Sequence, residues 1–128
     1  MHETAKGCCF CGAVRFTATL PSKWVAHCHC SMCRRAHGAA FVTWIGFPSG
    51  QVRVTEGADT LATHESSPGT FRMFCRHCGT KLFFESSRWP GETHVVLVAF
   101  DEPVDRPPAG HAFYEEHVAW LPTLRKPP

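Results

Sequence analysis

The sequence predicts a single, mainly β domain that carries metal-binding cysteines, and three observations support this prediction. Several short segments alternate apolar and polar side chains, which is the period of a half-buried strand. Helix signals are weak and confined to one short segment. Eight cysteines fall into three tight groups: Cys8, Cys9 and Cys11; Cys28, Cys30 and Cys33; Cys75 and Cys78. We therefore expect about seven short strands in one domain over residues 1–128, with a C-terminal tail at about 123–128.

The first predicted strand covers residues 14–20. From Val14 onward every second residue is apolar, and Pro21 ends the run. Three further segments show a similar alternation: 40–47, 51–57 and 70–75. A Pro-Ser-Gly turn separates the first two of these.

The remaining strands are predicted from their position and composition. Residues 81–86 follow directly after a Cys-Arg-His-Cys-Gly motif, so residues 70–86 are predicted to form a hairpin with a metal knuckle at its tip. Residues 93–100 are almost continuously apolar, which is typical of a strand covered on both faces.

One short helix is predicted after the second cysteine group. Ser31 is a suitable N-cap for a turn that carries residues 32–37. Gly38 is suited to end this turn.

Composition and charge exclude several functional classes. An apolar fraction of 44% with a charged fraction of 19% indicates a folded protein and not a disordered tail. The formal net charge is only +2, with the basic residues spread along the chain, so no nucleic-acid partner is expected. Residues 1–20 lack an apolar core of signal-peptide length, and no run approaches the roughly 20 apolar residues that span a bilayer. We expect a cytoplasmic protein with no membrane partner.

Metal binding is the expected role of the cysteines, because a reducing cytoplasm keeps thiols from forming disulfides. Cys75 and Cys78 form a C-x-x-C turn followed by glycine, which can aim two thiolates at one metal. Cys9 and Cys11 form a C-x-C pair whose side chains leave the same face of an extended segment. Joining the two pairs predicts a closed, structural zinc site with four thiolates.

An alternative pairing is a zinc ribbon made by Cys30, Cys33, Cys75 and Cys78. Ribbon knuckles usually lie about 15–20 residues apart, whereas 41 residues separate these two pairs. The ribbon would also leave three other cysteines without a metal. Cys8 is left over in both schemes and is expected to be a small buried or edge thiol.

The second cysteine group offers only three thiolates: Cys28, Cys30 and Cys33. Three protein ligands plus an exchangeable position is the arrangement of catalytic zinc. Alternatively, His27 or His37 closes the shell as a fourth protein ligand. His29 lies between the two cysteines of a C-x-C pair and is expected to point away from their metal.

An open position in this group would favour one kind of ligand. Three thiolates on a zinc dication carry a net charge of about −1, which makes the zinc a poorer Lewis acid than one held by three imidazoles. A soft thiol is therefore a better ligand than an activated water. Arg34 and Arg35 follow directly and are expected either to pair with carboxylates on such a substrate or to form a solvated pair at a helix end.

The three cysteine groups, in this order, resemble the glutathione-dependent formaldehyde-activating enzyme family, which also includes centromere protein V. The similarity is carried by GCCFCGAVRF at 7–16, CHCSMCRRAHGAAFVTW at 28–44 and SPGTFRMFCRHCGTKLFF at 67–84. A looser similarity covers residues 106–122.

The resemblance implies a β-tent fold of short antiparallel sheets and two zinc ions per chain. It implies a structural zinc bound by four residues: Cys9, Cys11, Cys75 and Cys78. It implies a catalytic zinc bound by three: Cys28, Cys30 and Cys33. His111 and Trp120 occupy similar positions in the family and are expected to be a hydrogen-bonded core histidine and a packed aromatic residue.

The implied activity is that of a carbon-sulfur lyase similar to S-hydroxymethylglutathione synthase. Such an enzyme adds a glutathione-like thiol reversibly to formaldehyde or another small carbonyl compound. The alternative function is a zinc-stabilised module that binds a protein partner without catalysis.

Overall fold

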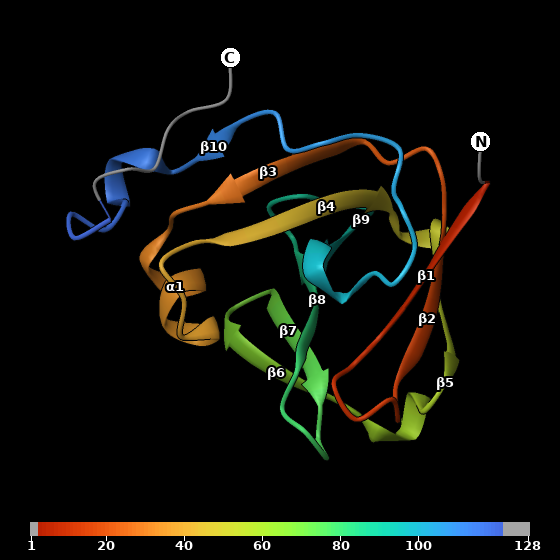
Figure 1. Ribbon diagram of the computed structural model, residues 1–128. Helices are drawn as coiled ribbons and strands as arrows, with labels where there is room; N and C mark the ends of the chain where they lie inside the picture. Colours follow the sequence, from red (N-terminus) through yellow and green to blue (C-terminus); the bar gives the residue numbers. More distant parts are fainter. Residues whose placement is uncertain (1–2, 122–128) are drawn as a thin grey trace.

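The structure, a computed structural model, describes residues 3–121 and consists of two β-sheets with one short α-helix (Figure 1). The smaller sheet has the order β1-β2-β5, and its neighbouring strands are antiparallel. Its strands are β1 (Thr4–Cys8), β2 (Arg15–Thr19) and β5 (Val52–Glu56).

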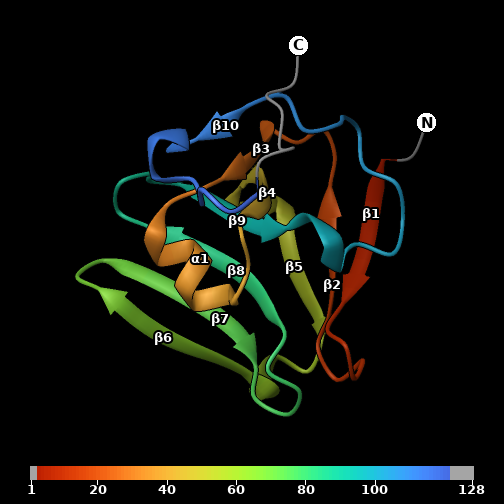
Figure 2. The same ribbon diagram turned by 60° about the vertical axis from the view of Figure 1, so that its left-hand side comes forward.

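The larger sheet has the order β10-β3-β4-β9-β8-β7-β6. Its neighbouring strands are antiparallel, except that β10 runs parallel to β3. Its strands are β3 (Trp24–Cys28), β4 (Val42–Pro48), β6 (Leu61–Ser67), β7 (Thr70–Cys75), β8 (Lys81–Ser86), β9 (Glu92–Val96) and β10 (His111–Ala112). The helix α1 (Ser31–His37) lies over this sheet, away from the three strands of the smaller one (Figure 2). Short 3₁₀ turns cover Ser49–Gln51, Ala58–Thr60, Leu97–Ala99 and Tyr114–Glu116.

The mainly β fold is confirmed, and the hairpin predicted over residues 70–86 is formed by β7 and β8. The structure has more strands than the seven or so that we predicted. The four strands without a prediction are β1, β3, β6 and β10. Of these, β6 is largely exposed and polar, so it lacks the apolar alternation that marks a strand in sequence. β10 has only two residues, which is too short to produce a pattern.

The strand predicted over 93–100 is too long, and its correction has a local cause. β9 ends at Val96, and the chain then forms the 3₁₀ turn Leu97–Ala99. Val98 is 87% exposed in this turn, so its apolar side chain misled the prediction. The described residues contain no helix that is both long and apolar enough to cross a membrane. The predicted tail at 123–128 lies outside the described residues.

The predicted cap of α1 is wrong by one residue. The N-cap is Cys30 and not Ser31: its backbone is extended, and its sulfur accepts a hydrogen bond from the Cys33 N–H at 3.3 Å. A thiolate can replace the usual oxygen here because the first turn of a helix offers unpaired N–H groups. Gly38 ends the helix as predicted, in the left-handed conformation with φ of 60°.

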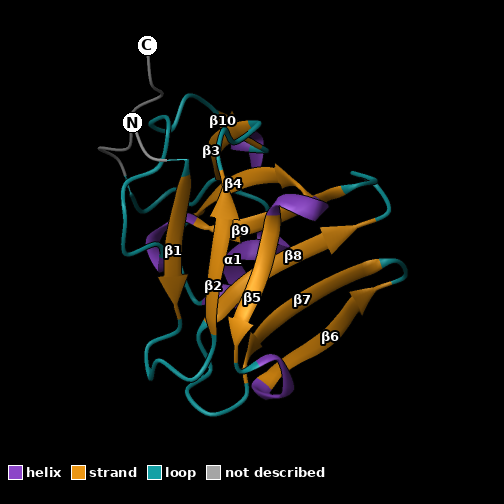
Figure 3. Ribbon diagram, turned by 90° about the vertical axis from the view of Figure 1, so that its right-hand side faces the viewer, coloured by secondary structure: helices purple, strands orange, loops and turns teal. Residues whose placement is uncertain are grey.

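The main core lies between the two sheets, which face each other in Figure 3. Phe16 of β2 and Phe47 of β4 are its largest fully buried side chains. The Phe16 ring meets the rings of Phe83 and Phe100 edge to face at 5.1 and 5.2 Å. Ile45 and Phe47 of β4 reach the same core from the larger sheet. The smaller sheet is therefore held to the larger one mainly by apolar packing.

The larger sheet also buries its opposite face. Because side chains alternate along a strand, β4 sends Ile45 into the main core and Trp44 to the other side. In β9, Val95 likewise faces the main core and His94 faces the other side. This second face positions the candidate site.

We predict that Phe16→Ala lowers the free energy of unfolding by about 3–5 kcal/mol, the usual cost of removing a buried phenyl ring. Urea denaturation of the metal-loaded protein measures this. Phe10→Ala is the matched control because that ring is 93% exposed, and it should change stability by no more than about 0.5 kcal/mol. Equal effects of the two substitutions would contradict the assigned core.

Candidate functional site

Four cysteines from two distant segments meet to form what we call the four-cysteine cluster: Cys9, Cys11, Cys75 and Cys78. Their sulfur atoms all lie within 4.8 Å of one another. The Cys9–Cys11 and Cys11–Cys75 sulfur distances are 3.7 and 3.8 Å. Tetrahedral zinc with bonds of about 2.3 Å requires sulfur atoms about 3.8 Å apart. The donor set therefore fits a tetrahedral metal ion.

Backbone hydrogen bonds shape this cluster. The tip of the β7–β8 hairpin is closed by the Gly79 N–H, which donates to the Cys75 carbonyl at 2.8 Å, and Gly79 adopts φ of 81° there. The Phe10 N–H donates to the Thr80 hydroxyl at 3.0 Å and so ties the loop after β1 to the hairpin. The two halves of the cluster are thus held together by protein contacts as well.

The environment favours ionised sulfur at Cys78 and Cys9 of the four-cysteine cluster. At Cys11 a backbone hydrogen bond with Ala13 is outweighed by burial and the neighbouring cysteines, which raise the pKa to about 11. Hydrogen bonds from the Thr80 hydroxyl and backbone lower the pKa of Cys78 to about 5. Burial opposes ionisation of Cys9, but the Val14 N–H donates to its sulfur at 3.3 Å, and the pKa of Cys9 is lowered. Thiolates are the form in which cysteine binds metal.

The three-cysteine cluster forms where β3 passes into α1, and it comprises Cys28, Cys30 and Cys33. All three side chains are buried, and their sulfur atoms lie within 4.8 Å of one another. Hydrogen bonds with Cys28 and Cys33 lower the pKa of Cys30, whereas hydrogen bonds with Cys30 and Cys33 raise the pKa of Cys28. Such mutually dependent thiols share negative charge, which a cation would stabilise. The two cysteine clusters could therefore each hold a metal ion.

No histidine nitrogen or carboxylate oxygen of residues 3–121 joins the three sulfur atoms. The His27 ring is hydrogen-bonded to the Thr43 hydroxyl at 2.8 Å, and the His37 ring packs edge to face on Trp44 at 5.3 Å. His29 turns away, as predicted, and its Nε2 lies 2.8 Å from Nδ1 of His111. Cys30 and Cys33 also do not meet Cys75 and Cys78, so the ribbon alternative is not formed.

Arg72 of β7 contacts the three-cysteine cluster. Its Nη1 donates to the Cys33 sulfur at 3.6 Å, and its guanidinium lies over the Phe84 ring at 5.0 Å. Only 8% of Arg72 is exposed. Sequence reasoning missed this residue, although alternation along the strand places it on the face opposite Phe71 and Met73.

The two arginines chosen from the sequence lie elsewhere. Arg34 and Arg35 line a separate hollow with Trp120, and neither lines the cavity beside the cysteines. The Arg34 side chain donates to the carbonyl of His29 at 3.1 Å. A role for these arginines in substrate binding stays a prediction.

Two other predicted residues have different outcomes. His111 makes the predicted hydrogen bond, but Trp120 is 71% exposed, so the prediction of a packed aromatic residue is wrong. Trp120 belongs to neither of the two buried clusters.

Cys8 is half-buried on edge strand β1, where its thiol donates to the Asp101 carboxylate at 3.4 Å.

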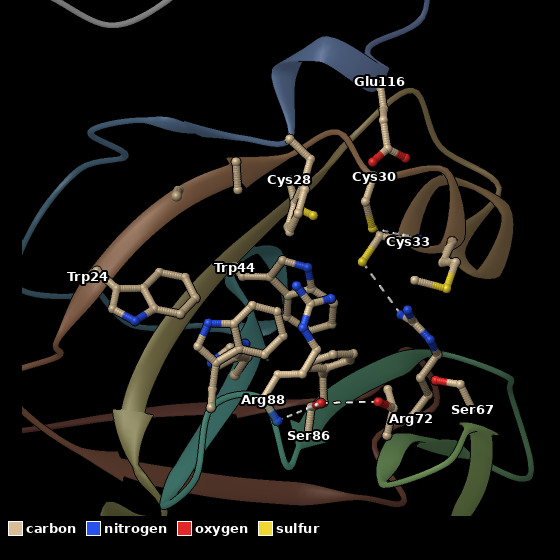
Figure 4. A pocket seen from close by; sticks show the side chains of 18 residues that line it. Trp24, Cys28, Cys30, Cys33, Trp44, Ser67, Arg72, Ser86, Arg88 and Glu116 are labelled. Carbon is tan, nitrogen blue, oxygen red and sulfur yellow. Dashed lines mark hydrogen bonds between the residues drawn. The ribbon is translucent and has the colours of Figure 1, made fainter.

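A cavity of about 360 Å³ opens beside the three-cysteine cluster (Figure 4). All three cysteines contribute to its lining. Trp24 lies toward one end and Cys33 toward the other, with Trp44 between them. Three charged residues line the cavity: Arg72 of β7, Arg88 of the turn after β8, and Glu116 of the last 3₁₀ turn. Buried thiols that face a cavity of this size can meet a small molecule.

Comparisons with known proteins agree with this geometry. The family described as "Glutathione-dependent formaldehyde-activating enzyme" matches residues 4–116. A Halomonas elongata protein named "Putative glutathione-dependent formaldehyde-activating enzyme" is 31% identical over 132 aligned residues, which cover 91% of this chain and 78% of the relative.

Two further relatives are more distant or cover less of the chain. An uncharacterized lyase of Schizosaccharomyces pombe is 29% identical over 79 residues, covering 62% of this chain and 56% of the lyase. A crystal structure of a Rhodobacter sphaeroides protein is 28% identical with a TM-score of 0.67, covering 77% of this chain and 89% of that one. The extent of the family match and the first relative together show that this chain belongs to the glutathione-dependent formaldehyde-activating enzyme family.

Proposed function

We propose that this protein is a zinc-dependent carbon-sulfur lyase, or thiol-adduct synthase, that acts on a glutathione-like thiol and a small carbonyl compound. One observation carries the proposal: three buried sulfur donors face a cavity, and no histidine, carboxylate or further cysteine among residues 3–121 joins them. Three protein ligands with an open position are typical of catalytic zinc, whereas structural sites are closed. The family to which the chain belongs is named for a reaction of this kind.

Two zinc ions per chain are proposed, one in each cysteine cluster. The four-cysteine cluster would be structural because it closes a tetrahedron and joins the loop after β1 to the β7–β8 hairpin. The three-cysteine cluster would be catalytic, and zinc bound there would deprotonate a substrate thiol and hold it in place. A reducing compartment such as the cytoplasm suits a chain whose function needs its thiols free.

The reaction proposed joins a thiol to a carbonyl carbon. The thiol sulfur supplies the electron pair of a new carbon-sulfur bond, and the π electrons of the carbonyl move to its oxygen. That oxygen takes up the proton that the thiol lost, giving a hydroxyalkyl thioether. With formaldehyde and glutathione the product is S-hydroxymethylglutathione. In the lyase direction the same bond breaks and the proton returns to sulfur.

The surrounding chain would position the reactants and balance their charge. Arg72 donates to Cys33 and lies between the cysteines and Phe84, so it offsets negative charge that a further thiolate would add. The rings on the cavity lining exclude water from the reacting sulfur. The competing function, a protein-binding module without catalysis, requires neither the cavity nor a cation beside the cysteines.

Metal analysis tests the two-site proposal. Wild-type protein saturated with zinc should contain two zinc ions per chain. Cys28→Ala should contain one and remain folded, because its cluster joins neighbouring segments, whereas Cys75→Ala should lose one zinc and unfold more readily. Cys8→Ala is the matched control, since Cys8 belongs to neither cluster, and should retain both ions. A single zinc in fully folded wild type would refute the two-site proposal.

Substitution of Arg72 tests the charge argument. Arg72→Gln should weaken binding of glutathione to the zinc-loaded protein about tenfold, because hydrogen bonds to charged groups contribute about 1.5–3 kcal/mol and about 1.4 kcal/mol corresponds to a factor of ten. Isothermal titration calorimetry measures the affinity. Arg53→Gln removes an exposed guanidinium of β5 that does not line the cavity and should leave the affinity unchanged. Absence of thiol binding to wild type under any condition would favour the non-catalytic module.

A further inference from the structure

The part of the cavity away from the cysteines is lined by what we call the aromatic wall: Trp24, Trp44, Phe84, Trp89 and His94. His94 is its centre. The His94 ring stacks on Phe84 at 5.5 Å with an interplanar angle of 20° and meets Trp24 edge to face at 4.6 Å. Trp89 lies 5.5 Å from the same ring. The wall is therefore a continuous set of rings contributed by four strands and one turn.

A missing side chain makes this arrangement possible. Gly46 of β4 pairs with Trp24 of β3 on one side and with His94 of β9 on the other. A Cβ atom at Gly46 would lie 2.4 Å from the Trp24 indole. The indole therefore crosses β4 over Gly46 and reaches His94. Because Gly46 has no side chain to fill this space, the Trp24 ring lines this end of the cavity.

Two ring nitrogens of the wall are bound behind it. The Trp24 Nε1–H donates to Glu92 Oε1 at 3.4 Å, and His94 Nε2 lies 2.9 Å from the same oxygen. Glu92 also pairs with Lys23 at 2.7 Å and does not line the cavity. Burial lowers the pKa of His94 despite the opposing effect of Glu92. Toward the cavity, the wall thus presents mainly uncharged ring surface.

Most polar groups elsewhere on the lining are also paired. The hydroxyls of Thr70 and Ser86 are 3.0 Å apart, and Ser86 also accepts from a backbone N–H at 3.2 Å. Glu116 accepts from the Ser31 N–H at the start of α1 at 2.9 Å. Arg72 is directed at Cys33. These contacts occupy part of the polar lining.

The Arg88 guanidinium is available to a ligand. Its guanidinium lies over Trp89 at 5.0 Å and near Phe113 at 6.0 Å, and the residue is exposed. No carboxylate of the described residues lies within ion-pair distance of it. The cavity therefore offers one cation without an anionic partner, next to the aromatic wall.

We propose that the preferred thiol carries a flat, uncharged ring that stacks in the aromatic wall, with at most one carboxylate, which pairs with Arg88. This inference rests on the proposed function and narrows its substrate class. Glutathione has two carboxylates, an ammonium group and two amides but no ring, so the aromatic wall contributes no ring stacking to its binding. A ring gains from stacking against other rings and from leaving water.

Titration calorimetry of the zinc-loaded protein with three thiols tests the preference. Phenylmethanethiol should bind at least tenfold more tightly than glutathione, and para-(mercaptomethyl)benzoate should bind most tightly of the three. Arg88→Gln should remove the advantage of the benzoate over phenylmethanethiol. Trp89→Ala should weaken both ring-bearing thiols about tenfold while leaving mercaptoethanol, which has no ring, unaffected. Zinc content measured after each titration verifies that the metal stays bound.

A sulfur-free probe separates the ring site from the thiol chemistry. Binding of para-methylbenzoate should depend on Trp89 and Arg88, and it should persist in Cys28→Ala. If no thiol binds but para-methylbenzoate does, the proposed function fails and the ring site stands. If glutathione binds through Cys28 as tightly as the ring-bearing thiols, or if Trp89→Ala changes nothing, the present inference is overturned while the proposed function survives.

Discussion

Burial of both faces of the larger sheet is the constraint on which the rest of the structure depends. Because side chains alternate along each strand, the residues next to each one that faces the main core face the opposite side of the sheet. The first set packs under the smaller sheet around Phe16, and the second set meets α1 and the segment around Phe113. The second covering is incomplete, and the resulting cavity contains the three-cysteine cluster. Fold and candidate site are thus two results of one packing requirement.

The two cysteine clusters differ in what they join, although each brings its sulfur atoms within 4.8 Å of one another. The four-cysteine cluster connects the loop after β1 to the tip of the β7–β8 hairpin, so a metal there would restrain segments distant in the sequence. The three-cysteine cluster lies within one short turn between β3 and α1, where the Cys30 sulfur also caps the helix. Its long-range contacts include the hydrogen bond from Arg72 to Cys33 and the pairing of Cys28 with Ala112 of β10. A metal in the three-cysteine cluster would therefore contribute less to the stability of the fold.

Sequence reasoning reached the fold class and the grouping of cysteines because both depend on local spacing. A C-x-C or C-x-x-C pair determines which sulfur atoms can meet, and period-two alternation marks most core strands. It could not find Arg72, Arg88 or the aromatic wall, since these meet only through strand register: Gly46 lies between Trp24 and His94 across three strands. Arg34 and Arg35 were chosen for closeness in sequence, but α1 turns them away from the cavity.

The central claim is that the three-cysteine cluster holds a metal whose fourth position is open to a substrate thiol. A crystal structure of the zinc-loaded protein, with anomalous scattering measured at the zinc edge before and after a thiol soak, tests it most directly. The claim predicts that the zinc in this cluster has three cysteine sulfurs and one non-protein ligand, which the thiol sulfur replaces in the soaked crystal. Coordination of that zinc by His27, His37 or any other fourth protein atom, unchanged by the thiol, would contradict it.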